Sequence, residues 1–462
     1  MSSIDTAIVA LYLFAMVAVG WYASRRQKGV EDYYVAGRRQ GSFSIACLWL
    51  ASFIGGASII GGSGKAYMMG ITAAWYVTGL AIGCFLFGLT FAARVKRIGD
   101  AHGHLTYPDL IEHHFDSRTR IVATITTTIA FIAFAAGQLA AAGSVLHVLL
   151  GWDFGTSLLV ASAVVILYTA FGGYLAVTWT DWIQFVLLLT GVVLIGLPIA
   201  VGNGGTPAKL MQQLPPSYFD IGAWGWSAIL AMVVSMSLSF FTAMDSYTRC
   251  FAARSPAAAR RGALVAVLFM LPIAVAATWM GMTAAVLFPG IESGDNVLTR
   301  FVLELFPTGL KGVMLVGILA AIMSTADICI LTASANVTRD VCQRFLKPDL
   351  AQGQMLRLGT VSSFAAGGLA TLLAWKMQDV LDILLLAFTL NSAALFLPTV
   401  AAVYGKRASA GAAFWSIGLS LVTVIAWHLA GSMGLGGWFE IEALWPGLLV
   451  SALTFYGLNR QS

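Results

Sequence analysis

Two hydroxyls and a carboxylate stand together in an otherwise apolar segment, residues 320–327, which reads AAIMSTAD. Ser324 and Thr325 follow Ala321 by about one helical turn, so two hydroxyls and a carbonyl can face one point. A ligand set made only of oxygen suits a hard cation. Hydrogen bonding of each hydroxyl to its own helix is the ordinary alternative. Asp327 favours the ion site, because a carboxylate at bilayer depth is rare and usually functional.

A glycine-rich stretch at residues 50–70, LASFIGGASIIGGSGKAYMMG, interrupts a second apolar segment. Each interior glycine costs a helix about 0.5–1 kcal/mol relative to alanine. The stretch indicates either a discontinuous helix whose freed carbonyls coordinate a cation at mid-membrane, or close helix packing through small residues. A phosphate-binding P-loop is excluded, because Ile59 and Ala66 stand where that motif needs Gly and Ser or Thr.

Three further polar side chains lie inside apolar segments. Asp181 follows the turn in GGYLAVTWTDWIQ and either belongs to a site or complements the N-terminal end of a helix. Gln138 and Asn391 either line a cavity or form hydrogen bonds between helices. The histidines of the loop AHGHLTYPDLIEHHF fit a solvated loop better than a metal centre.

The elements that position these residues must be membrane helices. The chain has 462 residues, of which 59% are hydrophobic and 10% charged, and its mean hydropathy is +0.84. An ordinary soluble chain is about 25% charged. Residues 5–24 lack the basic start and cleavage site of a signal peptide, so we expect a retained spanning helix. No nucleophile–base or metal-ligand set appears, so we expect no enzyme activity.

Apolar runs separated by turn and charge signals predict an all-helical polytopic membrane protein with about thirteen transmembrane helices. The whole chain, residues 1–462, then forms a single transmembrane domain. The predicted spans are residues 5–24, 43–70, 72–93, 121–149, 156–175, 178–201, 224–247, 262–288, 311–338, 356–376, 379–404, 412–430 and 442–458.

The basic residues gather on one set of alternate loops. Of the 26 Lys and Arg residues, the exceptions are Lys65, Lys209, Arg300, Lys311 and Lys376. The positive-inside rule makes the basic side cytoplasmic, which places the N-terminus outside and the C-terminus inside the inner (plasma) membrane. The net charge of +5 therefore reflects topology, and we expect a lipid bilayer and no nucleic acid as partner.

Several motifs, in order along nearly the whole chain, resemble the sodium:solute symporter family, which includes sodium-coupled proline, pantothenate, sugar and sialic acid transporters. They are DYYVAGRR, LTYPDLIEHHF, YTAFGGYLAVTWTDWIQ, and GILAAIMSTAD followed by SANVTRDV. The resemblance implies a LeuT-type five-plus-five inverted repeat with broken helices. It places residues 43–201 in the first repeat and 224–404 in the second, with 5–24 and 412–458 as peripheral spans.

The resemblance also implies ion sites. The family's shared sodium site would use the carbonyls of Ala51, Ile54 and Ala321 and the hydroxyls of Ser324 and Thr325. Some members hold a second, more cytoplasmic cation, for which this chain offers Asp181, Ser324 and Asp327. It departs from those members at Asp327 and Ile328, where they carry serines, so Asp327 ligates the ion, carries a proton or abolishes the site. Span seven also departs, because MDSYTR keeps only the arginine of the family's polar ending.

The sequence therefore predicts a sodium-coupled secondary active symporter, with sodium as the coupling ion, that imports a small organic solute by alternating access. An organic acid or amino acid is favoured over a sugar. We expect the protein to function as a monomer. Lys65 either attracts a carboxylate or extends to the outer interface. The substrate pocket should lie at the midplane between the repeats, with Phe53, Ser58, Gln138, Ser235, Ser239 and Asn391 as candidate lining residues.

Three alternatives remain. A sensor or receptor on the same fold would bind a solute without moving it, and would usually carry a signalling domain. A passive channel would need a continuous polar pore, whereas the polar residues here cluster at mid-depth. A proton-coupled symporter would use the same fold with another coupling ion.

Overall fold

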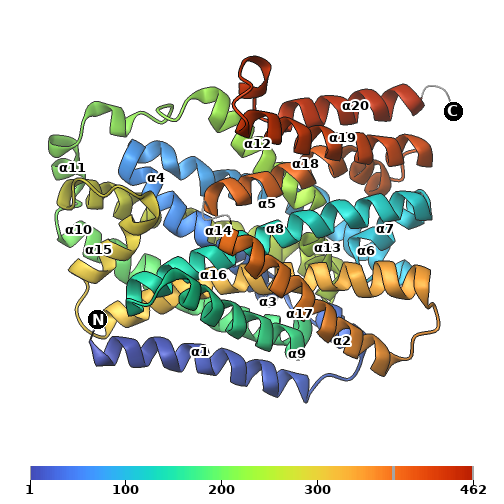
Figure 1. The fold of residues 1–462 in the computed structure, drawn as a ribbon, viewed down its shortest axis with the longest axis horizontal. Helices are drawn as coiled ribbons and strands as arrows, with labels where there is room; N and C mark the ends of the chain where they lie inside the picture. The colour runs from blue at the N-terminus through green and yellow to red at the C-terminus, as the bar shows by residue number, and fades with distance from the viewer. Residues whose placement is uncertain (1, 377–379, 460–462) are drawn as a thin grey trace.

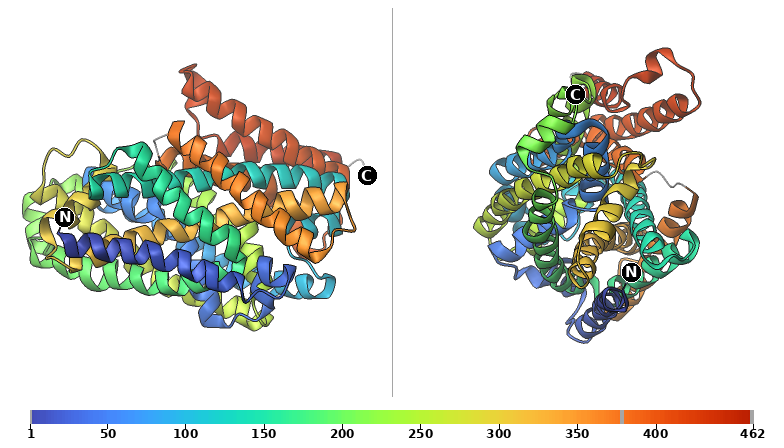
Figure 2. Two further views of the ribbon diagram at one scale, coloured as in Figure 1. Left: turned by 60° about the horizontal axis from the view of Figure 1, so that its bottom comes forward. Right: turned by 90° about the vertical axis from the view of Figure 1, so that its left-hand side faces the viewer.

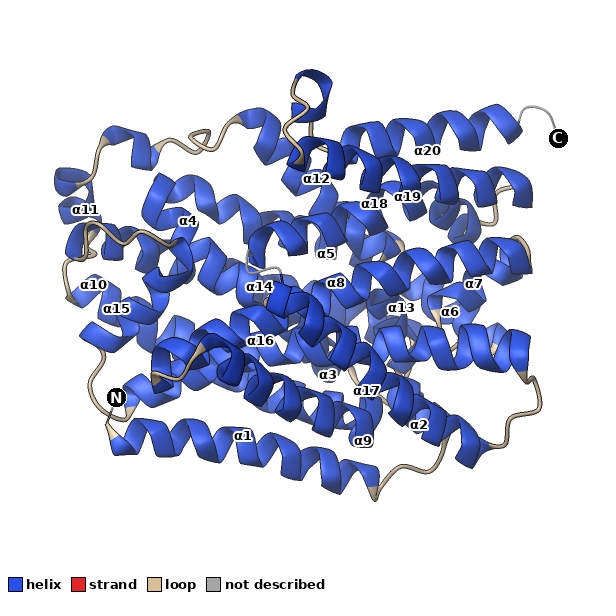
Figure 3. Ribbon diagram, viewed as in Figure 1, coloured by secondary structure: helices blue, strands red, loops and turns tan. Residues whose placement is uncertain are grey.

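The computed structural model describes residues 2–376 and 380–459, and this part of the chain is all-helical, as the sequence predicts. Figure 1 shows the long helices running along one common direction, and Figure 3 shows that mostly short loops join them. Residue 379, where one predicted span begins, lies outside the described residues. The first helix begins at one end of the bundle and the last described helix finishes at the other (Figure 1).

Eleven helices of the described residues have 16 residues or more. They are α1 (Ser3–Ser24), α5 (Trp75–Thr90), α8 (Ser117–Leu150), α9 (Phe154–Leu188), α12 (Trp226–Thr242), α14 (Pro256–Leu287), α16 (Leu310–Ala335), α17 (Gln352–Lys376), α18 (Val380–Tyr404), α19 (Ala410–Ser432) and α20 (Leu444–Asn459). Short helices cap the two ends of the bundle. At one end lie α2 (Val30–Val35), α6 (Ala92–His102) and α7 (Tyr107–His114), and at the other α10 (Leu197–Gly202), α11 (Pro207–Gln213) and α15 (Val297–Leu305) (Figure 1).

The glycine-rich stretch is an interrupted helix. Helix α3 (Ser42–Phe53) ends where Ile54 leaves the helical region with φ −99° and ψ 76°. The chain then passes through a wide turn, η2 (Ala57–Gly61), into α4 (Gly62–Met69). A Cβ atom at Gly55 would lie 2.7 Å from Thr325 Oγ1. Glycine is therefore required here by the close approach of α16.

A second interruption lies between α12 (Trp226–Thr242) and α13 (Met244–Ala252). The two helices meet at an angle of 46°. Ala243 is extended, with φ −68° and ψ 124°. The Tyr247 hydroxyl donates to the carbonyl of Phe241 at 2.6 Å, which satisfies one of the carbonyls that the break releases.

Helix α16 lies at the centre of the molecule. In its most apolar window 94% of the residues are buried, whereas the corresponding value for α1 is 28%. Figure 2 shows α1 and the pair α19 and α20 on the outer flanks of the bundle. The polar side chains of α16 are therefore enclosed by protein on all sides.

The predicted number of thirteen spans is not confirmed by helix length and composition. Among the described residues, nine helices meet those criteria, or ten if the bent pair α12–α13 counts as one span. Five of the nine are longer than 30 residues, and two of these, Ser58–Thr90 with 33 residues and Phe154–Gly202 with 49, contain a glycine with a positive φ. A helix of about 20 residues already spans the hydrocarbon core.

Candidate cation and substrate sites

The end of α3 and the middle of α16 meet as a cluster of oxygen atoms. The Ser324 hydroxyl donates to the carbonyl of Ala51 at 2.7 Å and to that of Ala321 at 3.0 Å. The Thr325 hydroxyl lies 3.4 Å and 3.2 Å from the same two oxygens. The structure thus brings four of the five predicted sodium ligands within hydrogen-bonding distance of one another, in an arrangement suited to a hard cation.

The fifth predicted ligand, the carbonyl of Ile54, lies at the break itself. In a continuous helix the N–H of Ser58 would pair with this carbonyl. Here that N–H donates to the carbonyl of Gly55 instead, at 3.1 Å. The interruption therefore releases the Ile54 carbonyl from the helical hydrogen-bond ladder, as coordination of an ion requires.

Gln138 on α8 holds the break in place. Its Oε1 accepts from the N–H of Gly56 at 2.9 Å, and the side chain is buried. The sequence left two alternatives for Gln138, namely lining a cavity or forming a hydrogen bond between helices. This contact is such a hydrogen bond. Gln138 is not among the residues that line the central cavity described below.

The second predicted cation set contains two buried carboxylates. The Tyr168 hydroxyl donates to Oδ2 of Asp327 at 2.8 Å. Among the described residues, Oδ1 of Asp327 and both oxygens of Asp181 have no hydrogen-bond partner. Both carboxylates are fully buried. Tyr168 was not among the predicted site residues, although it is the first residue of the YTAFGG motif.

Such a carboxylate pair is costly to bury without a compensating positive charge. The pair therefore fits a cation or a proton. The third member of the predicted set, Ser324, directs its hydroxyl to the carbonyls of Ala51 and Ala321.

A small central cavity of about 20 Å³ lies beside Thr325. Three of the six predicted substrate residues line it, namely Phe53, Ser239 and Asn391. The full lining is Ser52, Phe53, Ala130, Phe131, Phe134, Ser239, Ala243, Asp245, Thr325, Cys329, Phe388 and Asn391. Because Thr325 belongs both to this cavity and to the oxygen cluster, the two sites share a residue.

The other predicted substrate residues have their own partners. The Ser58 hydroxyl donates to the carbonyl of Phe53 at 3.2 Å. The Ser235 hydroxyl lies 3.5 Å from Thr389 Oγ1. Like Gln138, these two side chains are not among the residues that line the cavity.

An ion pair that was not predicted from the sequence lies at the cavity. Arg249 donates to Asp245 Oδ2 at 2.6 Å and to the carbonyl of Leu48 at 3.0 Å. Its guanidinium also lies 5.0 Å and 5.1 Å from the ring centroids of Trp49 and Phe53. The departure of MDSYTR from the family pattern was the signal that could have revealed Asp245.

Lys65 on α4 contacts an aromatic ring. Its ammonium nitrogen lies 4.3 Å from the ring centroid of Trp224, which precedes α12. This contact is a cation–π interaction. It is compatible with both sequence alternatives for Lys65.

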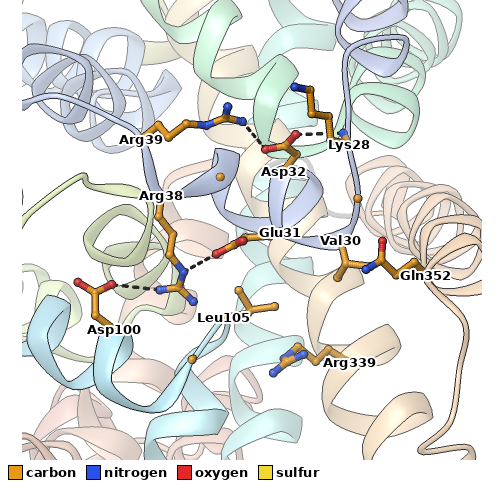
Figure 4. A pocket seen from close by; sticks show the side chains of 13 residues that line it. Lys28, Val30, Glu31, Asp32, Arg38, Arg39, Asp100, Leu105, Arg339 and Gln352 are labelled. Atoms are coloured by element: carbon orange, nitrogen blue, oxygen red, sulfur yellow. Dashed lines mark hydrogen bonds and ion pairs between the residues drawn. The ribbon is translucent and has the colours of Figure 1, made fainter.

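A wide pocket of about 780 Å³ opens at the end of the bundle that carries α2 and α6. Figure 4 shows its charged lining, in which Arg38 pairs with Glu31 at 2.6 Å and Arg39 with Asp32 at 2.7 Å. Leu105 lines this pocket and also a cavity of about 10 Å³ further inside.

That inner cavity approaches the central one. It is lined by Met244 and Ile328, the chain neighbours of Asp245 and Cys329, which line the central cavity. Tyr34 and Leu105 also line it. The central cavity, the inner cavity and the wide pocket thus form a row of cavities, in which the first two are lined by chain neighbours and the last two share Leu105.

A charge network joins α7 to α8 and to η7 (Asn336–Leu346). Arg120 pairs with Asp109 at 2.9 Å and also with Glu112 and Asp340. Burial alone would raise the pKa of Asp109, but Arg339 and Arg120 lower it to about 2. The carboxylate of Asp109 is therefore charged at any physiological pH.

An all-helical membrane bundle with two interrupted helices around buried oxygen ligands and a central cavity has the architecture of a secondary transporter. A family model described as "SSF: Sodium:solute symporter family" matches residues 33–419. The chain belongs to the sodium:solute symporter family, and its relatives are transporters, not enzymes. The resemblance seen in the sequence is thereby confirmed.

Curated relatives match almost the whole chain. The sodium/proline symporter of Escherichia coli is 28% identical, with 96% of this chain and 90% of that protein covered. The high-affinity proline transporter PutP of Bacillus subtilis is 25% identical, with 96% and 94% covered. These relatives support sodium-coupled symport of a small solute by a multi-pass membrane protein.

Solved structures show the same fold. A Na+-coupled sialic acid symporter in a substrate-bound outward-open state superposes with a TM-score of 0.85 at 21% identity, over 100% of this chain and 98% of that one. Mhp1, a nucleobase-cation-symport-1 family transporter in a closed conformation, superposes with a TM-score of 0.59 at 16% identity, over 93% and 95%.

Proposed function

We propose that this protein is a sodium-coupled secondary active symporter that imports a small organic solute across the plasma (inner) membrane by alternating access. The observation that carries the proposal is the meeting of the α3 break with α16. There the carbonyls of Ala51, Ile54 and Ala321 and the hydroxyls of Ser324 and Thr325 would hold sodium. The family membership of the chain supports sodium as the coupling ion.

Coupling follows from the shared residue. Sodium bound between α3 and α16 would hold the two helices together and orient Thr325, which also lines the central cavity. Each ligand would then favour the conformation that the other prefers, and this coupling is reciprocal. The membrane potential adds about 2.3 kcal/mol per 100 mV for each charge that enters the cell.

We further propose thirteen spans in a LeuT-type five-plus-five inverted repeat. Residues 43–201 and 224–404 would form the repeats, and residues 5–24 and 412–458 the peripheral spans. Gly70 (φ 74°) lies within the run Ser58–Thr90 and Gly173 (φ 53°, ψ −155°) within the run Phe154–Gly202, and each would divide its run into two spans. The opposite positions of the first and last helices also suit an odd number of crossings (Figure 1).

The end of the bundle with α2, α6 and α7 would face the cytoplasm, because most basic residues belong to the loops there. The N-terminus would then lie outside and the C-terminus inside. The row of cavities past Tyr34 and Leu105 would be the release path of the solute. We expect one chain to contain the complete pathway, so the monomer would be functional.

The buried pair of Asp181 and Asp327 supports a second coupling site. A second cation held by Asp181, Ser324 and Asp327 is one form of this proposal. A proton held by the carboxylate pair is the other, and it would make the protein a symporter that uses protons as well as sodium. The unpartnered oxygens of both carboxylates favour either form over a purely structural role.

The test is solute uptake into proteoliposomes that contain the purified protein. We expect accumulation driven by an inward sodium gradient, stimulated by an inside-negative potential, and abolished when a sodium ionophore dissipates the gradient. Potassium in place of sodium is the control. Accumulation that ignores sodium and follows only a proton gradient would contradict sodium coupling, and solute binding without accumulation would favour a sensor.

A further inference from the structure

The central cavity is lined by one carboxylate, whose ion-pair partner stands outside the lining. Among the described residues that line it, Asp245 is the single charged side chain. The remaining polar lining consists of three hydroxyls and one amide, from Ser52, Ser239, Thr325 and Asn391. A solute in this cavity therefore meets a carboxylate, and Arg249 is not among the residues that line it.

The arginine is held away from the cavity by its other contacts. Arg249 pairs with one oxygen of Asp245, but its Nε donates to Leu48 of α3, and its guanidinium lies near the rings of Trp49 and Phe53. Both members of the ion pair are buried. The other oxygen of Asp245, Oδ1, accepts from the N–H of Ser246 at 3.0 Å. Arg249 and this N–H thus fix the orientation of the Asp245 carboxylate, which lines the cavity while Arg249 does not. Each carboxylate oxygen keeps a second lone pair that a donor on the solute can use.

A second acceptor lines the same cavity. Oδ1 of Asn391 is buried and has no hydrogen-bond partner among the described residues. The side chain as a whole is 4% exposed. An unpartnered buried carbonyl oxygen of this kind indicates a missing donor. Asn391 and Asp245 therefore both offer oxygen acceptors to whatever occupies the cavity.

The walls of the cavity are largely aromatic. Phe53, Phe131, Phe134 and Phe388 all line it. Aromatic faces attract cations and exclude water, which strengthens any charge pair in the cavity. The Asp245 carboxylate would instead repel a solute that carries only a negative charge, and the low dielectric would strengthen this repulsion.

We propose that Asp245 binds a protonated amine of the transported solute and is a specificity-determining residue. Asn391 accepts a second hydrogen bond from the same nitrogen. This inference rests on the proposed symport function and narrows it, because it selects amino acids and other amines and disfavours organic acids without an amine. Arg249 is a positioning residue for Asp245.

The first test needs no mutation. Proteoliposomes with the wild-type protein and an inward sodium gradient are offered radiolabelled L-proline, L-alanine, lactate, succinate and glucose, one at a time. We expect sodium-driven accumulation only of solutes with a protonated amine, and at least a tenfold weaker competition by the N-acetyl derivative of an accumulated amino acid. Sodium-driven accumulation of lactate, succinate or glucose would overturn the inference while leaving sodium symport intact.

The second test uses Asp245→Asn, with Asp349→Asn in an exposed segment as the matched control. Asp245→Asn should raise the KM for the accumulated amine at least tenfold. It should leave the sodium concentration for half-maximal thermal stabilisation, measured without solute, within twofold of wild type. Asp245→Glu should restore part of the affinity, and the control should match wild type.

The two tests separate the inference from the proposed function. A KM within twofold of wild type in Asp245→Asn would overturn the role of Asp245. If Asp245→Asn does not fold, the wild-type solute panel still decides. If no solute on a broad panel accumulates with sodium, the proposed symport fails and this inference fails with it.

Discussion

At the scale of single residues, the hydroxyls of Ser324 and Thr325 combine two properties. Their hydrogen-bonding capacity is satisfied within the protein, because both hydroxyls contact the carbonyls of Ala51 and Ala321. They can also rotate and offer oxygen lone pairs to an ion. A buried site of this kind therefore folds without an ion and is still ready to bind one.

Ser324→Ala should weaken sodium activation strongly. A neutral group bonded to a charge contributes about 1.5–3 kcal/mol, which corresponds to about a 10–100-fold higher sodium concentration for half-maximal uptake. The measurement is initial uptake against sodium concentration. Ser334→Ala is the control on the same helix, since its hydroxyl donates to Gly359 instead. Equal sodium dependence in both variants would show that the Ser324 hydroxyl does not bind sodium.

Asp109 should make stability depend on pH in the acid range. Its pKa is lowered to about 2 from an ordinary value of 3.8. The stabilisation is therefore complete above pH 4 and is lost as the pH falls from about 4 to 2. We expect the thermal midpoint of Asp109→Asn, in detergent, to change less than that of wild type across this range. Asp349→Asn should behave like wild type.

At the scale of elements, the α3 break depends on one hydrogen bond from another helix. Gln138→Leu would leave the buried N–H of Gly56 without its acceptor, at a cost of about 1–3 kcal/mol. We expect a lower thermal midpoint and a weaker sodium response, because the Ile54 carbonyl loses its orientation. Gln213→Leu, in exposed α11, is the control. An unchanged midpoint in Gln138→Leu would show that water replaces the lost acceptor.

The interruption of the Phe154–Gly202 run depends on Gly173. An alanine there would adopt a φ of 53° and place its Cβ 2.5 Å from the Tyr33 ring. We expect Gly173→Ala to destabilise the protein by about 1–3 kcal/mol in chemical unfolding. Gly368→Ala, where a Cβ meets nothing within 4 Å, should be neutral or slightly stabilising. Equal stability of the two variants would contradict a strained turn at Gly173.

At the scale of the whole molecule, the orientation in the membrane can be measured directly. A reporter that fluoresces only in the cytoplasm should be active when fused to the C-terminus. The same reporter should be inactive when inserted at Gly204, in the loop before α11, where alkaline phosphatase should instead be active. The reverse pattern would invert the proposed topology, and an even number of spans would place the N-terminus inside.

Much of the helical layout could be predicted from the sequence, because the membrane imposes a local rule. Apolar length and glycine content depend on neighbouring residues alone, so the α3 break and the helical ranges follow from them. The number of spans was harder, because Gly70 and Gly173 connect successive helices without a polar loop.

The sequence by itself determined that this chain is a helical membrane protein with oxygen-bearing polar side chains in its apolar segments, since hydropathy and side-chain chemistry are properties of residue types. Only the tertiary structure decided which of those oxygens meet. Ser324 and Ala51 are 273 residues apart, and their contact depends on how α16 packs against α3. Packing also assigned Gln138 to the break and Asp245 to the cavity, because the side on which a polar group lies depends on the neighbouring helices.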